Sequence, residues 1–361
     1  MNIQPLYLTA LLLFGLLLTA CNEEFGSQSS ERSSKETDIE APVLERPLQK
    51  EAVTEFSVVA FNVENLFDHF DDPEKRDDDR TPTGRDKWTA EIFEKKLTNV
   101  AKVIADIGKE TSANAPAIIG LSEVENRYVI ERLVTTPTLK KYNYAIAHFE
   151  SPDERGIDVC LLYQKDKFIL LRSKKHFLPL LDTSGDRDYT RDQLVVSGLL
   201  DNELIYFIVH HWPSRSGGQV RSEPNRIAAA ELNRKTVDSI RLINPNAKII
   251  NMGDFNDDPN NKSIEDVLGA VGERDELTNN SIFYNPMMSF YKKGIGTSCY
   301  RDKWNVLDQV HVTPNLLIES NTKWYFWKAG IFNPSYLYNK KGRYKGYPFR
   351  SFAGGKFTGG Y

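Results

Sequence analysis

The sequence has few cysteines, no internal repeat and little excess of either charge, and each absence excludes a class of protein. Three cysteines in 361 residues are too few for a disulfide-rich secreted scaffold. No segment recurs at the spacing of a solenoid, and the net charge of −4 is unlike the basic excess of proteins that bind duplex nucleic acid tightly. The remaining composition, 40% hydrophobic with 16 Tyr and 19 Phe, supports one large globular core.

Long apolar runs are also scarce, and the one from Leu6 to Ala20 is too short to span a bilayer comfortably. It ends in "LTAC", which resembles the lipobox of bacterial lipoproteins, where cleavage before Cys21 leaves a thiol for diacylglycerol attachment. The pattern predicts a lipoprotein signal peptide over 1–20 and a lipid anchor on the periplasmic or cell-surface side of a bacterial membrane. Because "MNIQP" lacks the usual basic residues, an ordinary secretory signal peptide is the alternative.

Residues 21–52 are rich in Ser, Glu and Lys and poor in aromatic residues, so they are predicted to form a disordered tether. They carry a net charge of −4, and the following domain, 53–361, balances 42 basic against 42 acidic residues. Its last stretch, 320–361, holds 8 Lys or Arg and no Asp or Glu, so 53–319 has a net charge of −8. Cys160 in "DVCLLY" is predicted to be a small buried hydrophobe, and a disulfide with Cys299 is the alternative in an oxidising compartment.

The spacing of apolar residues predicts an α+β fold. Eight short β-branched or apolar runs are predicted strands, at 56–61, 117–121, 144–148, 157–163, 193–200, 204–211, 248–252 and 306–312. Two segments have helical spacing instead, 89–108, which stops at Gly108, and 223–243, where the pattern follows Pro224. Adjacent strand pairs joined by short turns, mixed with helices, indicate two mixed sheets packed together with helices outside, rather than a doubly wound parallel sheet.

Polar side chains gather where several predicted strands end. "FSVVAFN" ends on Asn62, "AIIGLSE" on Glu123, "LIYFIVHHWPSR" on His210, His211 and Arg215, and "KIINMGDFN" on Asp254 and Asn256. If these strands lie side by side, the polar groups line a cleft at one edge of the sheets. Carboxylates, amides and imidazole are suited to hold a divalent metal and a phosphate ester. A single Asn or Asp at a strand end is usually a turn former, so the inference depends on their joint occurrence.

Taken in order, Asn62, the Glu123 of "SEVEN", "HHWPSR", "GDFND" and "VLDQV" resemble the endonuclease/exonuclease/phosphatase superfamily, which includes deoxyribonuclease I, apurinic endonucleases and bacterial neutral sphingomyelinases. The likeness covers roughly 53–361. "GDFN" alone is moderately specific, whereas five elements in the correct order are strongly so. The resemblance implies a four-layer α/β sandwich of two central sheets flanked by helices, in agreement with the strand and helix pattern.

The resemblance also implies roles for these residues. Glu123 matches the family's metal carboxylate, and Asp308 in "VLDQV" matches an acid of the same centre that pairs with a late catalytic histidine. Mg²⁺ is the expected ion, with Mn²⁺ or Ca²⁺ as alternatives. Asp254 matches the aspartate that orients or deprotonates the attacking water, while Asn62 and Asn256 hold phosphate and neighbouring carboxylates.

Two points about the histidines stay open: which of two neighbouring histidines faces the site, and which residue takes the place of the family's late histidine. His210 and His211 are neighbours in a strand, so only one faces the site unless a bulge intervenes. Bacterial relatives favour His211 as the catalytic residue, whereas alignment with deoxyribonuclease I favours His210, which is kept as a phosphate ligand. The family's "SDH" triplet does not occur, and His311 lies three residues from Asp308, on the opposite face. The chain stops about where that triplet is expected, so the domain is expected to be truncated or to lack a principal acid.

Arginines supply candidate phosphate ligands. Arg155 in "DERGID" can donate a bidentate pair of hydrogen bonds to phosphate, and Arg215 is a second such candidate. Arg215 and Arg226 can equally be structural. Asp158 is expected only to turn the chain.

Three functions remain open. The favoured one is an extracytoplasmic, metal-dependent endonuclease, a monomer tethered to the membrane that acts on nucleic acid without a protein partner. The second is a phosphodiesterase or phosphatase for phospholipid head groups or other phosphate esters, and the third is a catalytically impaired surface lipoprotein. The tail "KWYFWKAGIFNPSYLYNKKGRYKGYPFRSF" can contact phosphates and bases, although Trp324 and Phe326 can instead fill the core. The acidic "DHFDDPEKRDDD" is predicted to be a solvated loop, because its spacing fits no EF-hand.

Overall fold

The computed structural model describes residues 10–16 and 54–361, apart from 110–113, 183, 279–280 and 321. Cys21, the predicted tether and all of the predicted signal peptide except 10–16 lie outside the described residues. Among the helices of the described part, none is both long and apolar enough to cross a membrane.

The first central sheet has six strands in the order β17-β1-β2-β3-β5-β4. They are β1 (Ala10–Leu16), β2 (Thr54–Leu66), β3 (Ile118–Val124), β4 (Tyr144–His148), β5 (Asp158–Gln164) and β17 (Tyr325–Ile331). β2 and β3 are parallel, and the other neighbours are antiparallel. Residues 10–16, which the sequence assigns to a signal peptide, form β1 between β2 and β17 in this structure.

The second central sheet has seven strands in the order β12-β13-β16-β11-β10-β9-β6. They are β6 (Phe168–His176), β9 (Gln193–Leu200), β10 (Glu203–His211), β11 (Lys248–Asp254), β12 (Ala270–Val271), β13 (Phe283–Tyr284) and β16 (Asp308–Val312). The predicted hairpin of β9 and β10 turns at Asp201 and Asn202, whose φ values of 44° and 69° suit a tight two-residue turn. β10 and β11 are parallel, so their carboxyl ends meet at one edge of the sheet.

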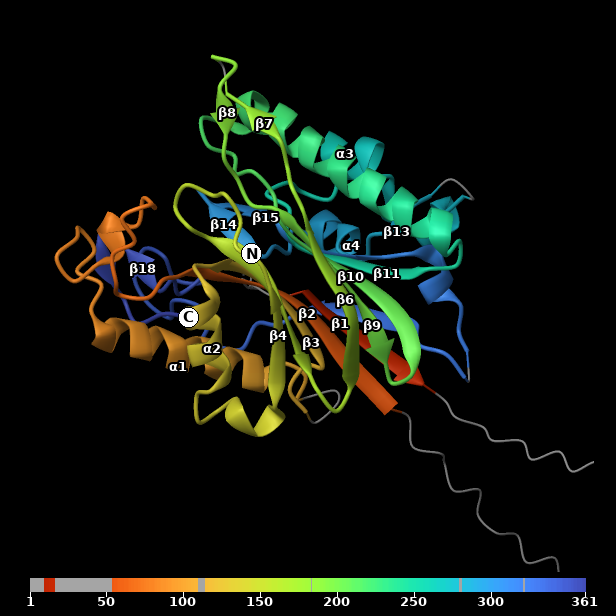
Figure 1. Cartoon of the computed structure of the whole chain (residues 1–361), viewed down its shortest axis with the longest axis horizontal. Helices are drawn as coiled ribbons and strands as arrows, with labels where there is room; N and C mark the ends of the chain where they lie inside the picture. The colour runs from red at the N-terminus through yellow and green to blue at the C-terminus, as the bar shows by residue number, and fades with distance from the viewer. Residues whose placement is uncertain (1–9, 17–53, 110–113, 183, 279–280, 321) are drawn as a thin grey trace, which may run out of the picture.

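Helices cover the outer face of each sheet (Figure 1). α1 (Ala90–Asp106) and α2 (Arg127–Val134) lie on the first sheet, and α3 (Gln219–Ile243) lies on the second. Alternation along β2 sends Val58 and Ala60 between the sheets and Val59 and Phe61 toward α1. The result is four layers with a core between each neighbouring pair, which confirms the α+β sandwich predicted from the sequence.

The helix boundaries differ slightly from the prediction. α1 begins after Thr89, whose side chain accepts a hydrogen bond from the Ile92 N–H, and it ends just before Gly108. α3 begins at Gln219, four residues earlier than the pattern indicates, and contains Pro224. Gly218, with φ of 109°, makes the sharp entry into the helix.

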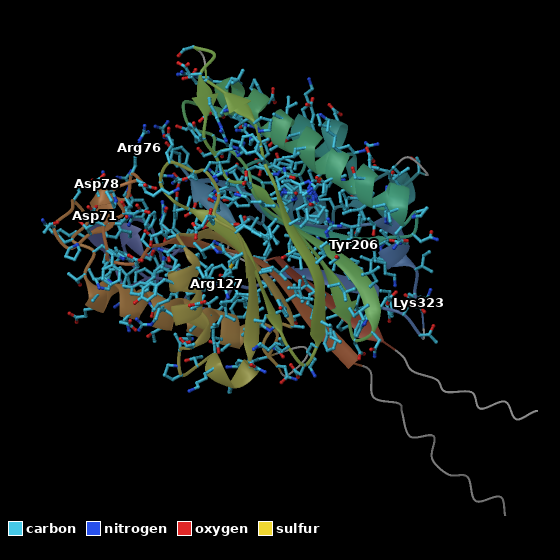
Figure 2. All side chains as sticks on the ribbon, in the orientation of Figure 1. Asp71, Arg76, Asp78, Arg127, Tyr206 and Lys323 are labelled. Atoms are coloured by element: carbon cyan, nitrogen blue, oxygen red, sulfur yellow. The ribbon has the colours of Figure 1, made fainter. Side chains whose placement is uncertain are left out.

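Three expectations about single segments are resolved. Trp324 and Phe326 lie in the core between the sheets, 1% and 4% exposed, so the core alternative holds for them. Cys160 is buried as predicted, and both it and Cys299 are free thiols, so the disulfide alternative is wrong. The acidic loop is solvated, with exposed Asp71 and Asp78 at the outer margin of the molecule (Figure 2).

Candidate active site

One edge of the sandwich collects the polar residues that end the central strands. His211 ends β10, Asp254 ends β11 and Asp308 begins the antiparallel β16, and strand pairing places these three in one row. Asn62 and Glu123 reach the same edge from the first sheet. Asn62 Nδ2 donates to Asp254 Oδ2 over 2.9 Å, and Glu123 Oε1 lies 3.7 Å from His211 Nε2. The structure therefore brings five of the predicted site residues together from five strands.

Unusual backbone conformations position these side chains. Glu123 has φ of 67° and lies at an irregularity of β3, where the register with β5 shifts. Such a bulge redirects a side chain from the face that regular alternation would give it. Gly253 has φ of 139°, and a Cβ there would lie 2.1 Å from the His210 carbonyl oxygen. Asn256, with φ of 50°, is one of the few residue types that tolerate the left-handed region. The "GDFN" sequence thus fits the sharp turn that exposes Asp254.

The carboxylates of the site repel one another in a dry environment. Asp254 accepts hydrogen bonds from Asn62 Nδ2 at 2.9 Å and from the Asn256 N–H at 2.8 Å. Burial, together with repulsion from Glu123, raises the pKa of Asp254 to about 6. Burial and the nearby Asp254 also raise the pKa of Asp308 well above its usual range, and Asp308 Oδ1 is buried without a hydrogen-bond partner among the described groups. This cluster favours a bound positive charge.

A divalent metal fits the site. Glu123, His211 and Asp254 each offer a ligand atom, and the three atoms lie within 4.8 Å of one another. Burial, with a smaller contribution from the nearby Arg191, keeps the pKa of His211 well below its usual range, so its imidazole is neutral and able to act as a ligand. Two carboxylates and an imidazole suit a divalent cation. The ligand set predicted from the sequence was Glu123 with Asp308; the geometry instead groups Glu123 with His211 and Asp254, beside the unpartnered oxygen of Asp308.

The choice between the two histidines is settled by the alternation of β10. The His210 side chain is fully buried on the opposite face, where its ring contacts the amides of Asn251 and Asn233. His311 lies in the same network, and burial lowers the pKa of both rings to about 3. The assignment of His210 as a phosphate ligand is therefore wrong, because the strand turns its side chain toward α3. His311 also faces away from the site, as its spacing from Asp308 predicts.

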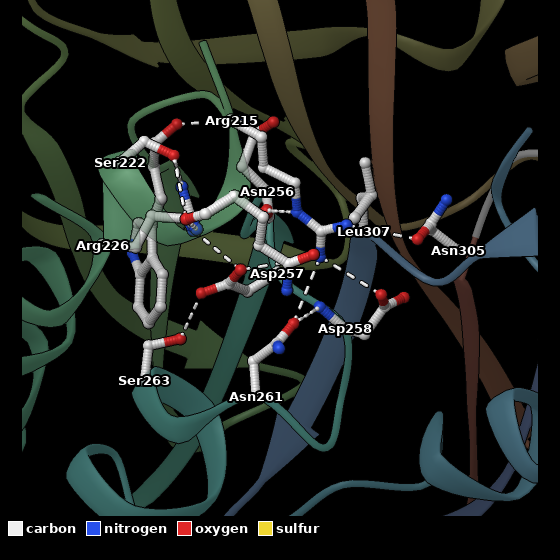
Figure 3. Close-up of polar contacts among 12 residues, drawn as sticks. Arg215, Ser222, Arg226, Asn256, Asp257, Asp258, Asn261, Ser263, Asn305 and Leu307 are labelled. Atoms are coloured by element: carbon white, nitrogen blue, oxygen red, sulfur yellow. Dashed lines mark hydrogen bonds and ion pairs between the residues drawn. The ribbon is translucent and has the colours of Figure 1, made fainter. Parts of the chain in front are cut away.

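Arg215 and Arg226 hold the loop that follows β11 (Figure 3). The three guanidinium nitrogens of Arg215 bind groups near the ends of β11 and β15 (Lys303–Asn305): the Asn256 carbonyl at 2.7 Å, Asp258 Oδ2 at 3.2 Å and Asn305 Oδ1 at 3.2 Å. Arg226 is fully buried and pairs with Asp257 at 2.7 Å. The prediction that Arg215 binds phosphate is corrected, since each of its nitrogens already has a protein partner.

Two other arginines lie near the metal ligands. Arg155 is half exposed, 3.7 Å from Asp153, and its charge acts on the imidazole of the site, so it remains a candidate phosphate ligand. Arg191, which the sequence analysis missed, is buried and donates to Asp153 at 3.1 Å and to the Trp212 carbonyl at 2.6 Å. The Asn256 side chain donates to that same carbonyl at 2.9 Å. Arg191 precedes β9 in a segment whose pattern carries no functional signal.

A cavity of about 200 Å³ opens beside the carboxylates, and the C-terminal part of the chain forms part of its wall. The wall residues include Thr297, Cys299, Pro348, Phe349, Arg350 and Tyr361. Arg350 forms an ion pair with Glu64, and the Ser351 N–H donates to Glu64 Oε2 over 2.6 Å. Neither member of this pair was predicted from the sequence. Glu64 has φ of 54° and lies where the register of β2 with β3 shifts, so the alternation of a regular strand does not predict where its side chain points.

A second group of metal-ligating residues is already occupied by internal contacts. His148 Nε2 lies 3.0 Å from Asp158 Oδ2, and the Ser151 N–H donates to Asp158 Oδ1 over 2.8 Å. These contacts hold the turn before β5, which agrees with the structural role expected for Asp158.

A sequence comparison identifies the family of this chain and agrees with the geometry of the site. A profile of the Endonuclease/Exonuclease/phosphatase family matches residues 57–361. The chain belongs to this family. The endonuclease/exonuclease/phosphatase family consists of phosphoesterases, and residues from four of the five motifs that suggested the resemblance line the cavity, namely Asn62, Glu123, Asp254 and Asp308. Comparison with curated proteins gives no significant match.

Several solved structures are similar to this endonuclease/exonuclease/phosphatase family member. The catalytic domain of human Nocturnin with bound sulfate is 17% identical, over 59% of this chain and 74% of that chain, with a TM-score of 0.39. D. rerio TDP2 with a single-strand DNA product is 14% identical, over 60% and 77%, with a TM-score of 0.40. A mannosyl-6-phosphatase of Bacteroides thetaiotaomicron is 14% identical, over 69% and 83%, with a TM-score of 0.42. At these values the similarities do not indicate a substrate.

Proposed function

We propose that this chain is a divalent-metal-dependent phosphodiesterase that hydrolyses nucleic-acid phosphodiester bonds outside the cytoplasm. The observation that carries the proposal is the meeting of Asn62, Glu123, His211, Asp254 and Asp308 at one edge of both sheets, beside a cavity. Membership of the endonuclease/exonuclease/phosphatase family supports phosphoester chemistry.

In the proposed reaction, Asp254 orients and deprotonates the attacking water. In the metal-free site, burial and the nearby Glu123 raise the pKa of Asp254 to about 6, which makes this carboxylate a stronger base than a solvated aspartate. Each oxygen of Asp254 accepts one hydrogen bond from the protein, from Asn62 or from the Asn256 backbone, and keeps a lone pair free for a water molecule. The two asparagines therefore fix the direction of the carboxylate without occupying all of its acceptor sites.

A bound metal and a guanidinium group would together offset the negative charge of the substrate phosphate. Glu123, His211 and Asp254, with Asp308 beside them, would hold the metal, which when bound neutralises phosphate charge and activates water. Arg350 also lines the cavity, and its guanidinium is paired with Glu64. A phosphate in the cavity would thus have both the ligand cluster and a guanidinium on the surrounding wall.

A substrate panel tests the proposal. Plasmid DNA, RNA, bis-p-nitrophenyl phosphate, a sugar phosphate and sphingomyelin are incubated with the protein and Mg²⁺, Mn²⁺ or a chelator. We expect cleavage of nucleic acid and of the small diester, abolished by chelator, and a loss of roughly 10²-fold to 10⁴-fold in Asp254→Asn. Asp166→Asn, at an exposed turn carboxylate, is the matched control and should turn over at the wild-type rate.

Each outcome of the panel has a defined meaning. Cleavage of sphingomyelin or of the sugar phosphate alone would replace the nuclease proposal by the second function inferred from the sequence. Activity that persists in excess chelator would show that the reaction needs no metal. Full turnover by Asp254→Asn would show that Asp254 has no part in the mechanism. Silence of the folded protein on every substrate would favour a surface lipoprotein without catalysis.

We also propose that Cys21 is acylated and anchors the protein to a membrane. The anchor rests on the lipobox-like "LTAC" and on the polar composition of 22–52, which is too hydrophilic to insert by itself. Cleavage before Cys21 would remove β1 and leave the edges of β2 and β17 without the strand that separates them. Residues 10–16 would therefore be absent from a mature chain that begins at Cys21, whereas in this structure they form a strand of the first sheet.

Mass spectrometry of the protein extracted from membranes tests the anchor. We expect a chain that begins at Cys21 with the added mass of a diacylglyceryl group. Cys21→Ser should appear in the soluble fraction, while Cys299→Ser, at a cysteine outside the lipobox, should remain with the membranes. A mature protein that retains residues 10–16, or a Cys21→Ser variant that still sediments, would contradict the proposal.

A further inference from the structure

A second and larger cavity adjoins the candidate active site. Its volume is about 690 Å³, compared with about 200 Å³ for the catalytic cavity. Cys299, Pro348, Phe349 and Arg350 line both cavities, so the two lie side by side. We call the larger part the tyrosine groove, after Tyr300, Tyr344 and Tyr347, which are among the residues that line it.

The tyrosine groove is positively charged, although the body of the domain is acidic. Arg301, Arg343 and Arg350 line it, and Asp302 is the one carboxylate among its lining residues. The Asp302 carboxylate accepts a hydrogen bond from the Tyr347 hydroxyl, so it is engaged within the wall. Arg350 is paired with Glu64, so Arg301 and Arg343 are the cations that remain in the groove against Asp302, and this excess favours a polyanion beside the carboxylates that would hold the catalytic metal.

The aromatic rings of the groove are exposed and supported from one side. The Tyr300 and Tyr344 side chains are 67% and 57% exposed, which is unusual for rings of this size. The Arg301 guanidinium lies 5.3 Å from the Tyr300 ring, and that of Arg343 lies 5.7 Å from the Tyr344 ring. Tyr347 packs against Tyr344 edge to face, with ring centroids 5.5 Å apart. Each exposed ring is thus paired with a cation and can offer a face to a planar ligand.

We infer that the tyrosine groove binds single-stranded nucleic acid next to the scissile phosphate, with bases stacked on Tyr300 and Tyr344 and phosphates on Arg301 and Arg343. This inference rests on the proposed nuclease function and names its substrate class. Exposed aromatic faces beside guanidinium groups are the elements with which proteins hold unpaired strands. Bases of a duplex are already stacked, so they cannot use these rings. The groove volume also lies in the range of small-ligand sites, which fits one or two unpaired nucleotides and not a double helix.

A binding measurement tests the groove without requiring catalysis. Full-length Asp254→Asn protein in chelator is titrated against a fluorescein-labelled 12-nucleotide single strand, and anisotropy gives the Kd. Adding Tyr344→Ala should weaken binding roughly 5-fold to 100-fold, because a base–aromatic stack contributes about 1–3 kcal/mol. Tyr344→Phe should restore it, since the ring is kept. Arg343→Ala should reduce the slope of log Kd against log salt by about 0.7, the value for one phosphate contact with a single strand.

The chain contains a matched control for these variants. Arg187 lies 4.4 Å from the Tyr189 ring, so the same pair of residue types stacks outside both cavities, near the β7–β8 hairpin (Leu180–Leu181 with Arg187–Asp188). Arg187→Ala and Tyr189→Ala should change the Kd less than 2-fold. If they weaken binding as much as the groove variants, the effect is one of general charge and the inference is wrong. A duplex of the same sequence that binds as tightly as the single strand would also overturn it.

A cleavage measurement separates failure of the groove from failure of the function. The ratio of kcat/KM for the single strand to kcat/KM for bis-p-nitrophenyl phosphate is compared between the wild type and the groove variants with Mg²⁺. We expect the ratio to fall about 10-fold or more in Tyr344→Ala and Arg343→Ala. An unchanged ratio together with unchanged binding rejects the groove while the phosphodiesterase stands. Strand binding through the groove without hydrolysis of any substrate supports the groove and rejects the proposed function.

Discussion

Removal of the charge at Asp254 should stabilise the metal-free protein at neutral pH while it removes activity. The pKa of this buried carboxyl is about 6, compared with the usual 3.8, because burial and the nearby Glu123 disfavour the charged form. The raised pKa means that the native state binds the proton more tightly than the unfolded chain. The free energy of unfolding is therefore highest below about pH 4, where the group is protonated in both states. It falls as the pH rises from 4 through 6, because the native state must then give up a tightly held proton.

The magnitude follows from the two pKa values. The difference between about 6 and 3.8 corresponds to about 3 kcal/mol of lost stability above pH 7. Asp254→Asn avoids this loss, but an amide has one acceptor oxygen where the carboxylate accepts from both Asn62 and the Asn256 N–H. One hydrogen bond is forfeited, at a cost of about 1 kcal/mol. The net gain at pH 8 is about 2 kcal/mol, or a rise in Tm of roughly 3 °C for a domain of this size.

Thermal unfolding of both proteins between pH 4 and pH 8, in chelator, checks this reasoning. Asp254→Asn should melt above the wild type at pH 8, and the order should reverse near pH 4, where only the lost hydrogen bond remains. Added Mg²⁺ should raise the Tm of the wild type more than that of the variant, because a ligand that binds the native state stabilises it by mass action. A difference in Tm that does not vary with pH, or a variant that is less stable at pH 8 in chelator, would refute the account of a strained carboxylate.

Two further changes have defined outcomes. Gly253→Ala should lower the free energy of unfolding by about 3 kcal/mol or more, because its Cβ would meet the His210 carbonyl oxygen at 2.1 Å; a urea titration that detects less than 1 kcal/mol would contradict this. Arg215→Ala should cost about 2–4 kcal/mol in the same titration, since it leaves the loop that contains Asp258 without its cation, whereas a loss of phosphate affinity at unchanged stability would restore the phosphate-binding role.

The layers of this protein and one edge of its site follow from local patterns. Alternation along segments such as "FSVVAF" and helical spacing in 89–108 are set by which face of each element is buried, and that is enough to predict two sheets covered by helices. Asn62, Glu123 and Asp254 were found for the same reason. They are polar groups that interrupt apolar strands at their ends, and strands of one sheet bring such ends together.

Other features depend on contacts that no local pattern contains. His210 and His211 are adjacent and chemically identical, and only the direction of β10 relative to α3 decides which one meets Glu123. Arg215 has the composition of a phosphate ligand, but its three nitrogens are taken by groups 41 to 90 positions away.

The C-terminal part of the cavity wall shows most clearly that some features depend on contacts between distant parts of the chain. Arg350 and Glu64 are 286 positions apart, and neither is part of a motif that predicts the other. Composition indicated that the tail is basic and aromatic, but it could not separate Trp324, which packs in the core, from Tyr344, which is exposed in the tyrosine groove. Burial of an aromatic ring is decided by what lies opposite it, and for the last forty residues that is supplied by distant parts of the chain. The sequence by itself therefore specifies the sandwich and its catalytic edge, and the packing of the C-terminal segment against that edge determines the shape and charge of the groove that adjoins it.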